Sequence, residues 1–172
     1  MNENAAAAQL QSRFPDAIGE VTTRLGETMV EIKKSALPDV ARFLRDDEAL
    51  RFVLLSDVTC VDYLPQEPRF AVVYHLLSIE QRQRLRLRVW VAEGQPELPS
   101  VTAIWPGANW YEREIFDMFG LTFTDHPDLR RILMPDDWEG HPLRKDYALG
   151  SEEIAFTHNQ EEIYARKSFA KS

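Results

Sequence analysis

Apolar residues recur with helical spacing in the first part of the chain. From Ser35 onward they occupy positions i, i+3, i+4 and i+7, and Pro38 falls in the first turn, where its missing N–H is harmless. The four apolar positions are Leu37, Val40, Ala41 and Leu44. This spacing predicts an amphipathic helix that ends near Asp46.

Weaker patterns precede that helix. The alanine-rich stretch 5–14 predicts a helix that Pro15 helps to end. Two short apolar stretches, 21–25 and 29–32, flank Gly26 and predict two strands joined by a turn.

Three runs of strand character follow, at 52–57, 70–77 and 84–91. The run 84–91 alternates without exception, with leucines and valines on one side and three arginines and Trp90 on the other. One side therefore faces the core, and the other faces either water or an acidic partner. The run 70–77 is apolar on both sides, which predicts an interior strand that is covered on both faces.

A second strong helical pattern lies between two turn signals. A short strand is predicted at 101–105, and Asn109 is a suitable N-cap for the helix that follows. Glu112 stands at the third helical position, where its carboxylate can reach the N–H of the cap in a capping box. Gly120 is expected to end the helix in the left-handed conformation.

This helix is aromatic on more than one side. Trp110 and Phe116 lie outside the main apolar face, so we expect contacts on at least two sides. Arg113 and Asp117 are four residues apart and are predicted to pair with each other. The main apolar face consists of Tyr111, Ile115, Met118 and Phe119.

The regular pattern stops after Gly120. Prolines at 127, 135 and 142 interrupt the chain, and irregular segments of this length are usually functional loops, linkers or arms. From Ser151 a charged, weakly amphipathic pattern is compatible with a helix or with a tail. Too many apolar side chains occur for a disordered segment, so we expect an arm that is buried against another surface. These side chains are Leu129, Ile132, Leu133, Met134, Trp138, Leu143 and Tyr147.

These elements predict an α+β fold. Helices and strands mix without the strict alternation of a doubly wound parallel sheet. We predict a two-layer domain at 1–120, with a mixed β-sheet packed against helices, followed by an extended irregular C-terminal arm at 121–172.

Composition excludes several classes of protein. The chain has 172 residues and a formal net charge of −8, which argues against binding nucleic acid through phosphate neutralisation. Its single cysteine, Cys60, cannot form an intramolecular disulfide or hold an iron–sulfur cluster, which needs about four thiolates. No apolar run approaches the roughly 20 residues of a membrane helix, and no targeting segment is evident. We expect a cytoplasmic protein of a bacterial-type cell.

Candidate chemistry is sparse. Four histidines, at 75, 126, 141 and 158, show no metal-site spacing, and no phosphate-binding loop or nucleophile elbow occurs. The carboxylates of Glu112, Glu114 and Asp117 favour an ion network over proton transfer, because they do not share one helical face. We therefore predict no catalytic, cofactor-binding or metal-binding residue in this chain.

Three segments, 108–120, 126–135 and 142–147, carry a long ordered motif: ERE, two residues, D, two hydrophobic residues, then a spaced His and Arg. This motif resembles the 30-kilodalton subunit family of respiratory complex I, the bacterial NADH:quinone oxidoreductase. The likeness covers most of the chain after about residue 35. The family signature and expected interface residues are Glu112, Arg113, Glu114, Asp117, Phe119, Gly120, His126, Arg130, Arg144, Lys145 and Asp146.

The resemblance implies a subunit of a proton-pumping enzyme that is not catalytic by itself. It implies docking on the 49-kilodalton subunit among other hydrophilic-arm subunits, on the cytoplasmic side of the bacterial plasma membrane as a peripheral protein. No cofactor is expected in this chain, whereas FMN, iron–sulfur clusters and quinone are expected in partner subunits. A chain truncated after residue 120 should then fail to co-purify with the 49-kilodalton subunit.

Other functions stay open from the sequence. Relatives of the same family serve photosynthetic NDH complexes and membrane-bound hydrogenases, and this chain could be the equivalent subunit of either. A more distant alternative is a stand-alone hydrolase that uses His126 and the acidic helix around Glu112.

Overall fold

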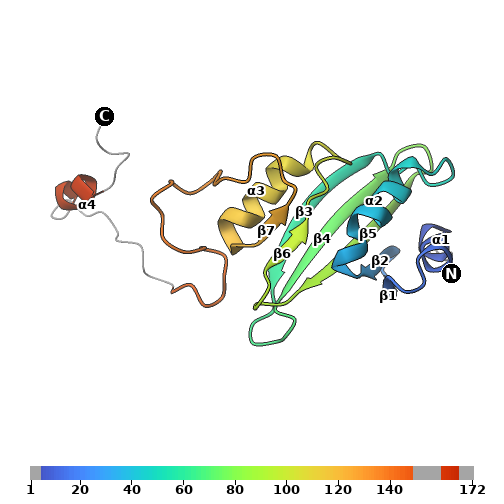
Figure 1. The fold of residues 1–172 in the computed structure, drawn as a ribbon, viewed down its shortest axis with the longest axis horizontal. Coiled ribbons are helices and arrows are strands. Elements are labelled where there is room, and N and C mark those ends of the chain that lie inside the picture. Colours follow the sequence, from blue (N-terminus) through green and yellow to red (C-terminus); the bar gives the residue numbers. More distant parts are fainter. Residues whose placement is uncertain (1–4, 149–159, 167–172) are drawn as a thin grey trace.

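A five-stranded mixed sheet carries the fold of this computed structural model, which describes residues 5–148 and 160–166 (Figure 1). The strand order is β1-β2-β5-β4-β3, and every neighbouring pair is antiparallel except β2 and β5. The strands are β1 (Ile18–Arg24), β2 (Glu27–Ile32), β3 (Leu54–Asp62), β4 (Phe70–Ser78) and β5 (Gln83–Val91). The predicted α+β class with a mixed sheet is confirmed.

Helices cover one face of this sheet. Helix α1 (Ala5–Arg13) and helix α2 (Leu37–Asp46), which a short 3-10 helix (Lys34–Ala36) precedes, lie on the same side in Figure 1. All four apolar positions predicted for α2 are buried. Every second residue of β4 and β5 on this face is also buried, which confirms the two-layer arrangement.

The other face of the sheet is only partly covered. The predicted alternation of β5 is confirmed, because its leucines and valines are buried while its arginines are half-buried or exposed. Strand β4 is interior, between β3 and β5. The prediction that it is covered on both faces was wrong, since Val73, His75 and Leu77 are half-buried. Their register partners on β5 are arginines, whose long side chains cover them only in part.

The chain after β5 builds a small second sheet around α3 (Ala108–Phe119). Strands β6 (Glu97–Pro99) and β7 (Thr122–Thr124) pair in parallel, one before and one after this helix. The strand predicted at 101–105 is wrong: the N–H groups of Ile104 and Trp105 both bond to the carbonyl of Val101 in a turn. Leu121 and Phe123 are buried in the same core as the helix.

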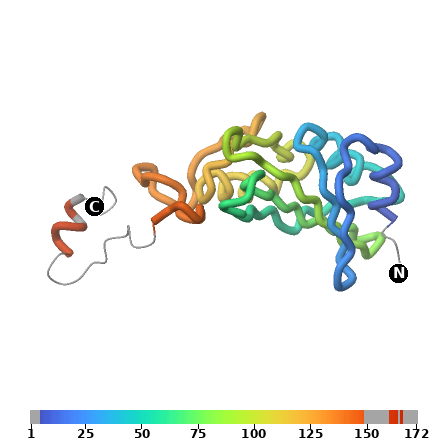
Figure 2. The backbone as a smooth tube through the Cα atoms, turned by 90° about the horizontal axis from the view of Figure 1, so that it is seen from below, coloured from blue at the N-terminus to red at the C-terminus, as the bar shows by residue number. Residues whose placement is uncertain are grey.

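Residues 125–148 contain no helix or strand and run back along α3 (Figure 1). We call this segment the arm loop. Figure 2 places it and the β1–β2 turn in opposite halves of the domain. Helix α4 (Gln160–Arg166) lies in the C-terminal segment, whose sequence was compatible with either a helix or a tail. Residues 149–159 lie outside the described residues.

Candidate functional site

The carboxylate of Asp117 holds the arm loop on α3. Its Oδ2 accepts hydrogen bonds from the backbone N–H groups of Ile132, Leu133 and Met134 at 3.0, 2.8 and 2.9 Å, and its Oδ1 accepts one from Arg131 at 2.6 Å. Burial alone would raise the pKa of Asp117, but these four donors lower it below the usual value. A single ionised side chain thus organises three consecutive residues of the arm loop.

The predicted pair between Arg113 and Asp117 was wrong. Asp117 pairs with Arg131, which also donates to the carbonyls of Trp138 and Gly140 at 3.0 and 3.2 Å. Arg113 instead donates to the carbonyls of residues 130 and 131 at 3.2 and 3.1 Å. Both arginines bond to arm-loop carbonyls, which would otherwise lack partners in an irregular segment.

The arm loop also caps the C-terminal end of α3. The last helical carbonyls need external partners, and three of them find these in the loop. The carbonyl of Asp117 lies 2.9 Å from Nδ1 of His141, that of Met118 accepts the N–H of Leu143 at 3.1 Å, and that of Phe119 accepts Nε of Arg144 at 2.6 Å. The helix end and the loop therefore form one hydrogen-bonded unit.

Gly120 allows this close approach. The residue has a φ of +73° as the left-handed C-cap, as predicted. A Cβ at this position would lie 2.4 Å from Nε2 of His141, so the site needs glycine for space as well as for backbone conformation.

Glu112 does not form the predicted capping box. The helix begins at Ala108 with Gly107 as its N-cap, and the buried carboxylate of Glu112 points elsewhere. It accepts a bond from Oγ of Ser100 at 2.6 Å and one from the N–H of Val101 at 2.8 Å. Burial raises the pKa of Glu112 to about 7 despite these two donors. Its neighbour Glu114 is exposed.

Glu112 should make folding stability depend on pH. Because its folded pKa lies above its unfolded value, the stabilisation is complete below about pH 4.5 and is lost as the pH rises through about 7. We expect this group to lower the free energy of unfolding by about 3 kcal/mol between these limits. In Glu112→Gln the amide can still accept from Val101 and donate to Ser100, so this fall should disappear in urea titrations at about pH 5 and pH 8.

Glu114→Gln is the matched control for that measurement, because Glu114 is exposed on the same helix. We expect this variant to keep the pH dependence of the wild-type chain. If Glu112→Gln and Glu114→Gln showed the same dependence, the assignment to Glu112 would be wrong.

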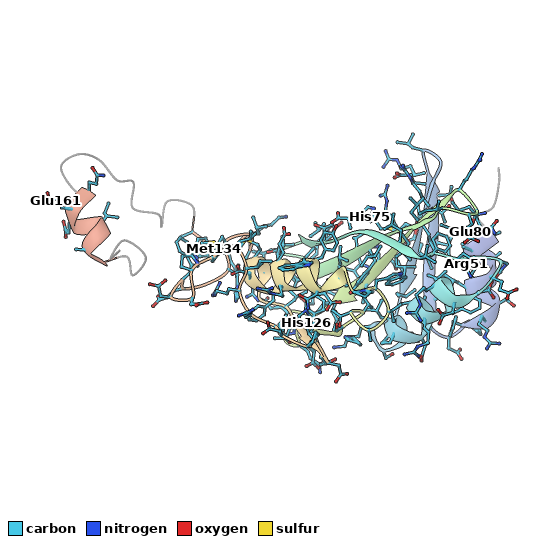
Figure 3. All side chains as sticks on the ribbon, turned by 90° about the horizontal axis from the view of Figure 1, so that it is seen from above. Arg51, His75, Glu80, His126, Met134 and Glu161 are labelled. Carbon is cyan, nitrogen blue, oxygen red and sulfur yellow. The ribbon has the colours of Figure 1, made fainter. Side chains whose placement is uncertain are left out.

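The side chain of His126 is buried between α3 and the start of the arm loop (Figure 3). Its Nδ1 accepts the N–H of Asp128 at 3.0 Å, and its Nε2 lies 3.4 Å from the carbonyl of Asn109 and 4.0 Å from the carboxylate of Glu112. Burial is the main reason that the pKa of His126 is lowered. Both ring nitrogens of His126 thus face groups of the protein itself. Arg130, by contrast, is exposed, and its side chain pairs with the carboxylate of Asp128 at 2.9 Å.

A buried arginine outside the predicted set fixes the end of the arm loop. Arg69 is 1% exposed and uses all five of its N–H groups on the carboxylates of Asp62, Glu93 and Asp146. Asp62 also accepts the backbone N–H of Lys145 at 2.8 Å. Hydrogen bonds from Arg69 lower the pKa values of Asp62 and Asp146, so both carboxylates stay ionised.

Sequence reasoning missed Arg69 because no local pattern marks it. Its partners stand 7, 24 and 77 residues away along the chain. The one available signal is an arginine placed directly before the apolar run of β4, where a charge is costly unless it is paired.

All but two of the predicted signature residues therefore fall into three connected groups. Glu112 and His126 meet at the start of α3. At the end of the arm loop, Asp146 pairs with Arg69, and the backbone N–H of Lys145 bonds to Asp62. Glu114 and Arg130 face outward. The residues that join the end of α3 to the arm loop are Arg113, Asp117, Phe119, Gly120 and Arg144.

Within the described residues, no group of three or more His, Cys, Asp or Glu side chains is placed to hold a metal ion. Burial raises the pKa of the Cys60 thiol to about 12, so it stays protonated at neutral pH. In the same part of the chain, no helix is long and apolar enough to cross a membrane.

Comparison with known proteins assigns the family. The family model of the respiratory-chain NADH dehydrogenase 30-kilodalton subunit matches residues 30–153, which contain β3, β4, β5, α3 and the arm loop. The chain belongs to this family. As a member of it, the chain is a subunit of NADH-quinone oxidoreductase, an oxidoreductase complex of the respiratory chain.

Members of this family match nearly the whole chain. The corresponding NADH-quinone oxidoreductase subunit of Roseiflexus castenholzii is 57% identical over 164 residues, which are 95% of this chain and 94% of the relative. The protein of the same name from Herpetosiphon aurantiacus is 46% identical over the same shares of the two chains.

Solved structures share the fold. A trypsin-resistant fragment of Nqo5 is 34% identical, with a TM-score of 0.60, and the match covers 71% of this chain and 96% of the fragment. A chain of an archaeal membrane-bound sulfane sulfur reductase is 26% identical, with a TM-score of 0.69 and 83% coverage of both chains.

Proposed function

We propose that this chain is a non-redox structural subunit in the peripheral arm of a proton-pumping NADH:quinone oxidoreductase. In this role it docks on the 49-kilodalton subunit and supports assembly of the path from NADH to quinone. The observation that carries the proposal is the hydrogen-bonded unit of α3 and the arm loop, which fixes apolar side chains on the surface.

Two leucines of the arm loop are exposed while their backbones are held. Leu133 is 60% exposed and Leu143 is 53% exposed. The N–H of Leu133 bonds to the carboxylate of Asp117, and the N–H of Leu143 bonds to the carbonyl of Met118. Asp117 and Met118 are neighbours in sequence, so both leucines lie at the same end of α3. Because the backbone is already ordered, a partner gains apolar contact without the entropy cost of ordering the loop.

We propose that residues 1–120 form the α+β domain and that residues 121–172 act as the partner-binding arm. The first strand of this arm, β7, is tied to β6 of the domain. The existence of a trypsin-resistant fragment of Nqo5, matching 71% of this chain, supports a stable domain without the C-terminal end.

The proposal assigns no redox group to this chain. The protonated, buried thiol of Cys60 is unsuited to ligate a metal, since the thiolate is the ligating form. FMN, the iron–sulfur clusters and quinone would belong to partner subunits. The chain would then sit on the cytoplasmic side of the plasma membrane, held there through the complex.

The likeness to the sulfane sulfur reductase chain supports one alternative: an equivalent subunit in another membrane-bound complex, such as a photosynthetic NDH or a hydrogenase. The higher identity, over 95% of the chain, to a subunit of NADH-quinone oxidoreductase favours the first proposal. A hydrolase that uses His126 is disfavoured, because the side chains of His126 and Glu112 are both buried.

The docking proposal is tested by placing charge on the two leucines in the full chain. We expect the variant with Leu133→Asp and Leu143→Asp to co-purify with the 49-kilodalton subunit at least about tenfold less well, because two carboxylates would be buried at the interface. The measurement is quantitative mass spectrometry of the isolated complex, together with thermal unfolding of the free chain.

We prefer these two substitutions to a truncation after residue 120, because the truncation would also remove Leu121 and Phe123, which are buried in the core. Ala49→Asp, on an exposed turn after α2, is the control and should co-purify like the wild-type chain. Full recovery of the 49-kilodalton subunit with the double variant would contradict the proposal.

A further inference from the structure

The exposed large apolar side chains include a second group, far from the arm loop. Leu25 is 94% exposed and Ile79 is 62% exposed, and Val53 and Leu54 are also exposed. They stand in three segments, 24–27, 51–54 and 79–86, which we call the hairpin-end surface. Figure 3 shows Arg51 and Glu80, which belong to it, at the end of the domain away from Met134 of the arm loop.

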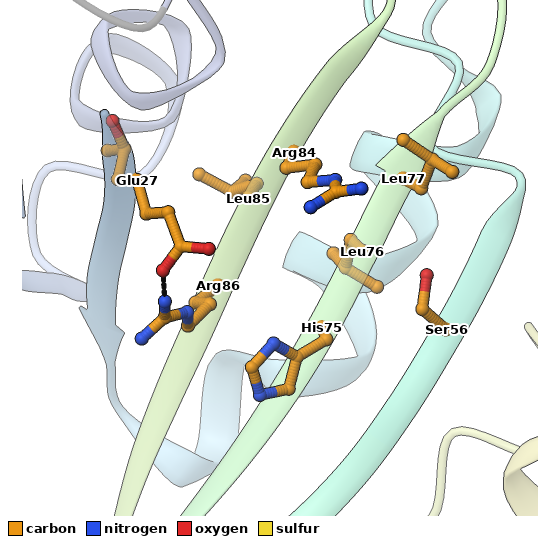
Figure 4. A pocket seen from close by; sticks show the side chains of 9 residues that line it. Glu27, Ser56, His75, Leu76, Leu77, Arg84, Leu85 and Arg86 are labelled. Atoms are coloured by element: carbon orange, nitrogen blue, oxygen red, sulfur yellow. Dashed lines mark ion pairs between the residues drawn. The ribbon is translucent and has the colours of Figure 1, made fainter. Parts of the chain in front are cut away.

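The strand register brings these segments together. Leu54 lies opposite Leu77 on β4, and Leu77 lies opposite Arg84 on β5. Glu27 and Arg84 line the same hollow, whose volume is about 290 Å³ (Figure 4). Leu25 lies two residues before Glu27, and Ile79 lies two residues after Leu77. Both residues therefore lie at the same end of the strands.

The conformation of Leu25 gives it no advantage within this chain. The β1–β2 turn consists of Leu25 and Gly26, both with positive φ, and two-residue turns of this kind strongly prefer asparagine or glycine at the first position. Leucine there is unfavourable for the backbone, and its side chain buries almost nothing. An exposed leucine in such a position indicates a contact with another molecule.

The hairpin-end surface is positively charged on an acidic chain. Its three segments contain five arginines and two glutamates, whereas the whole chain has a net charge of −8. The glutamates pair with arginines, Glu80 with Arg51 at 3.2 Å and Glu27 with Arg86. An acidic partner would therefore be attracted to this end and repelled by much of the remaining surface.

We infer that the hairpin-end surface is a second docking surface, which binds an acidic and partly apolar segment of another protein subunit. Leu25, Leu54 and Ile79 provide the apolar contacts, and carboxylates of the partner approach the exposed arginines Arg82 and Arg84. This surface is separate from the arm loop, and the inference does not depend on what the arm loop binds.

A protein fits this surface better than a lipid bilayer does. Anionic head groups would also be attracted to arginines beside exposed aliphatic residues. However, the carboxylate of Glu27 is fixed at the hollow, where it would repel a uniformly anionic surface (Figure 4). The side chains of a protein segment can place carboxylates at the arginines and apolar groups at the leucines.

A photo-crosslinking residue at Ile79 of the full chain, in the complex assembled in its native host, tests the inference. We expect a crosslink to one subunit, at a peptide that contains both carboxylates and apolar residues. The same residue placed at Gln66, in the exposed turn between β3 and β4, should give no crosslink to that peptide. A crosslink to lipid, a crosslink to a basic peptide or no crosslink at Ile79 would each overturn the inference.

The variant with Leu25→Asp and Arg82→Glu provides the second measurement. Both residues are exposed in turns, so the free chain should unfold at the wild-type temperature. We expect the Ile79 crosslink to fall at least about tenfold, and the wild-type crosslink to weaken as salt rises from about 0.1 M to about 1 M, where the Debye length shortens from about 10 Å to about 3 Å. An unchanged crosslink in the variant contradicts the inference.

The Leu133 and Leu143 variant separates this inference from the proposed function. That variant should co-purify less well with the 49-kilodalton subunit, whereas the Ile79 crosslink is read in the wild-type complex and does not involve those leucines. The two tests are therefore independent, because either docking surface can fail its own test while the other surface passes.

Discussion

Replacing Arg69 with alanine should lower the free energy of unfolding by about 3–5 kcal/mol. The substitution removes the shared partner of three carboxylates, and it leaves Asp62 buried and charged beside Asp146. The end of the arm loop should also detach, because Asp146 bonds to Arg69 through two N–H groups at 2.9 and 2.7 Å. Urea unfolding measures the first effect, and amide hydrogen exchange at residues 141–148 measures the second.

The pH dependence separates this ion network from a packing effect. Because the pKa values of Asp62 and Asp146 are lowered, their stabilisation is present above the unfolded value near about 4 and is lost as the pH falls through the folded values. The difference between Arg69→Ala and the wild-type chain should therefore shrink in strong acid. A difference that stays constant with pH would show that packing around the side chain dominates.

Arg42→Ala is the matched control, since Arg42 forms a surface ion pair with Asp39 at 3.4 Å. Such pairs contribute about 0–1 kcal/mol. Arg69→Lys keeps the charge but loses the five-donor geometry, so its stability should lie between that of Arg69→Ala and the wild-type chain.

Replacing Asp117 with alanine should lower the free energy of unfolding by about 3 kcal/mol or more. The substitution leaves three backbone N–H groups without their acceptor and removes the carboxylate that pairs with Arg131. A donor that loses its partner away from water costs about 1–3 kcal/mol. We expect the arm loop to lose protection against hydrogen exchange at 132–134 while the sheet keeps its protection. Co-purification with the 49-kilodalton subunit should fall as well, because Leu133 would no longer be held.

Asp128→Asn is the control for Asp117, because the carboxylate of Asp128 is exposed and pairs with Arg130 on the surface. Its effect on unfolding should stay below about 0.5 kcal/mol. Undiminished protection at 132–134 in Asp117→Ala would mean that the arginines, rather than the carboxylate, hold the loop.

The two proposed docking surfaces would give the chain a role that depends on both ends of the domain. The arm loop is ordered by charges buried within the chain, whereas the hairpin-end surface displays its arginines and aliphatic side chains directly. We therefore expect loss of arm-loop order to weaken one contact and leave the other intact. Such a subunit would hold neighbouring subunits in place without carrying electrons.

The sequence by itself determined the elements whose signals are local. The spacing of Leu37, Val40, Ala41 and Leu44 defines α2, and the alternation of 84–91 defines β5, because each pattern repeats with the period of its own backbone. Gly120 was predictable as a C-cap because glycine adopts the left-handed conformation at a helix end without strain. The ERE motif indicated the family, but it did not reveal what each of its residues contacts.

Only the tertiary structure decided the partners of the charged residues. Glu112 bonds to Val101 rather than to the helix start, Asp117 to the arm loop rather than to Arg113, and Asp146 to Arg69 across 77 residues. A carboxylate on a helix has many donors within reach, and its neighbours in sequence are only some of them. Which donor it meets depends on how separate segments pack, because a buried charge must be paired wherever the fold provides a partner.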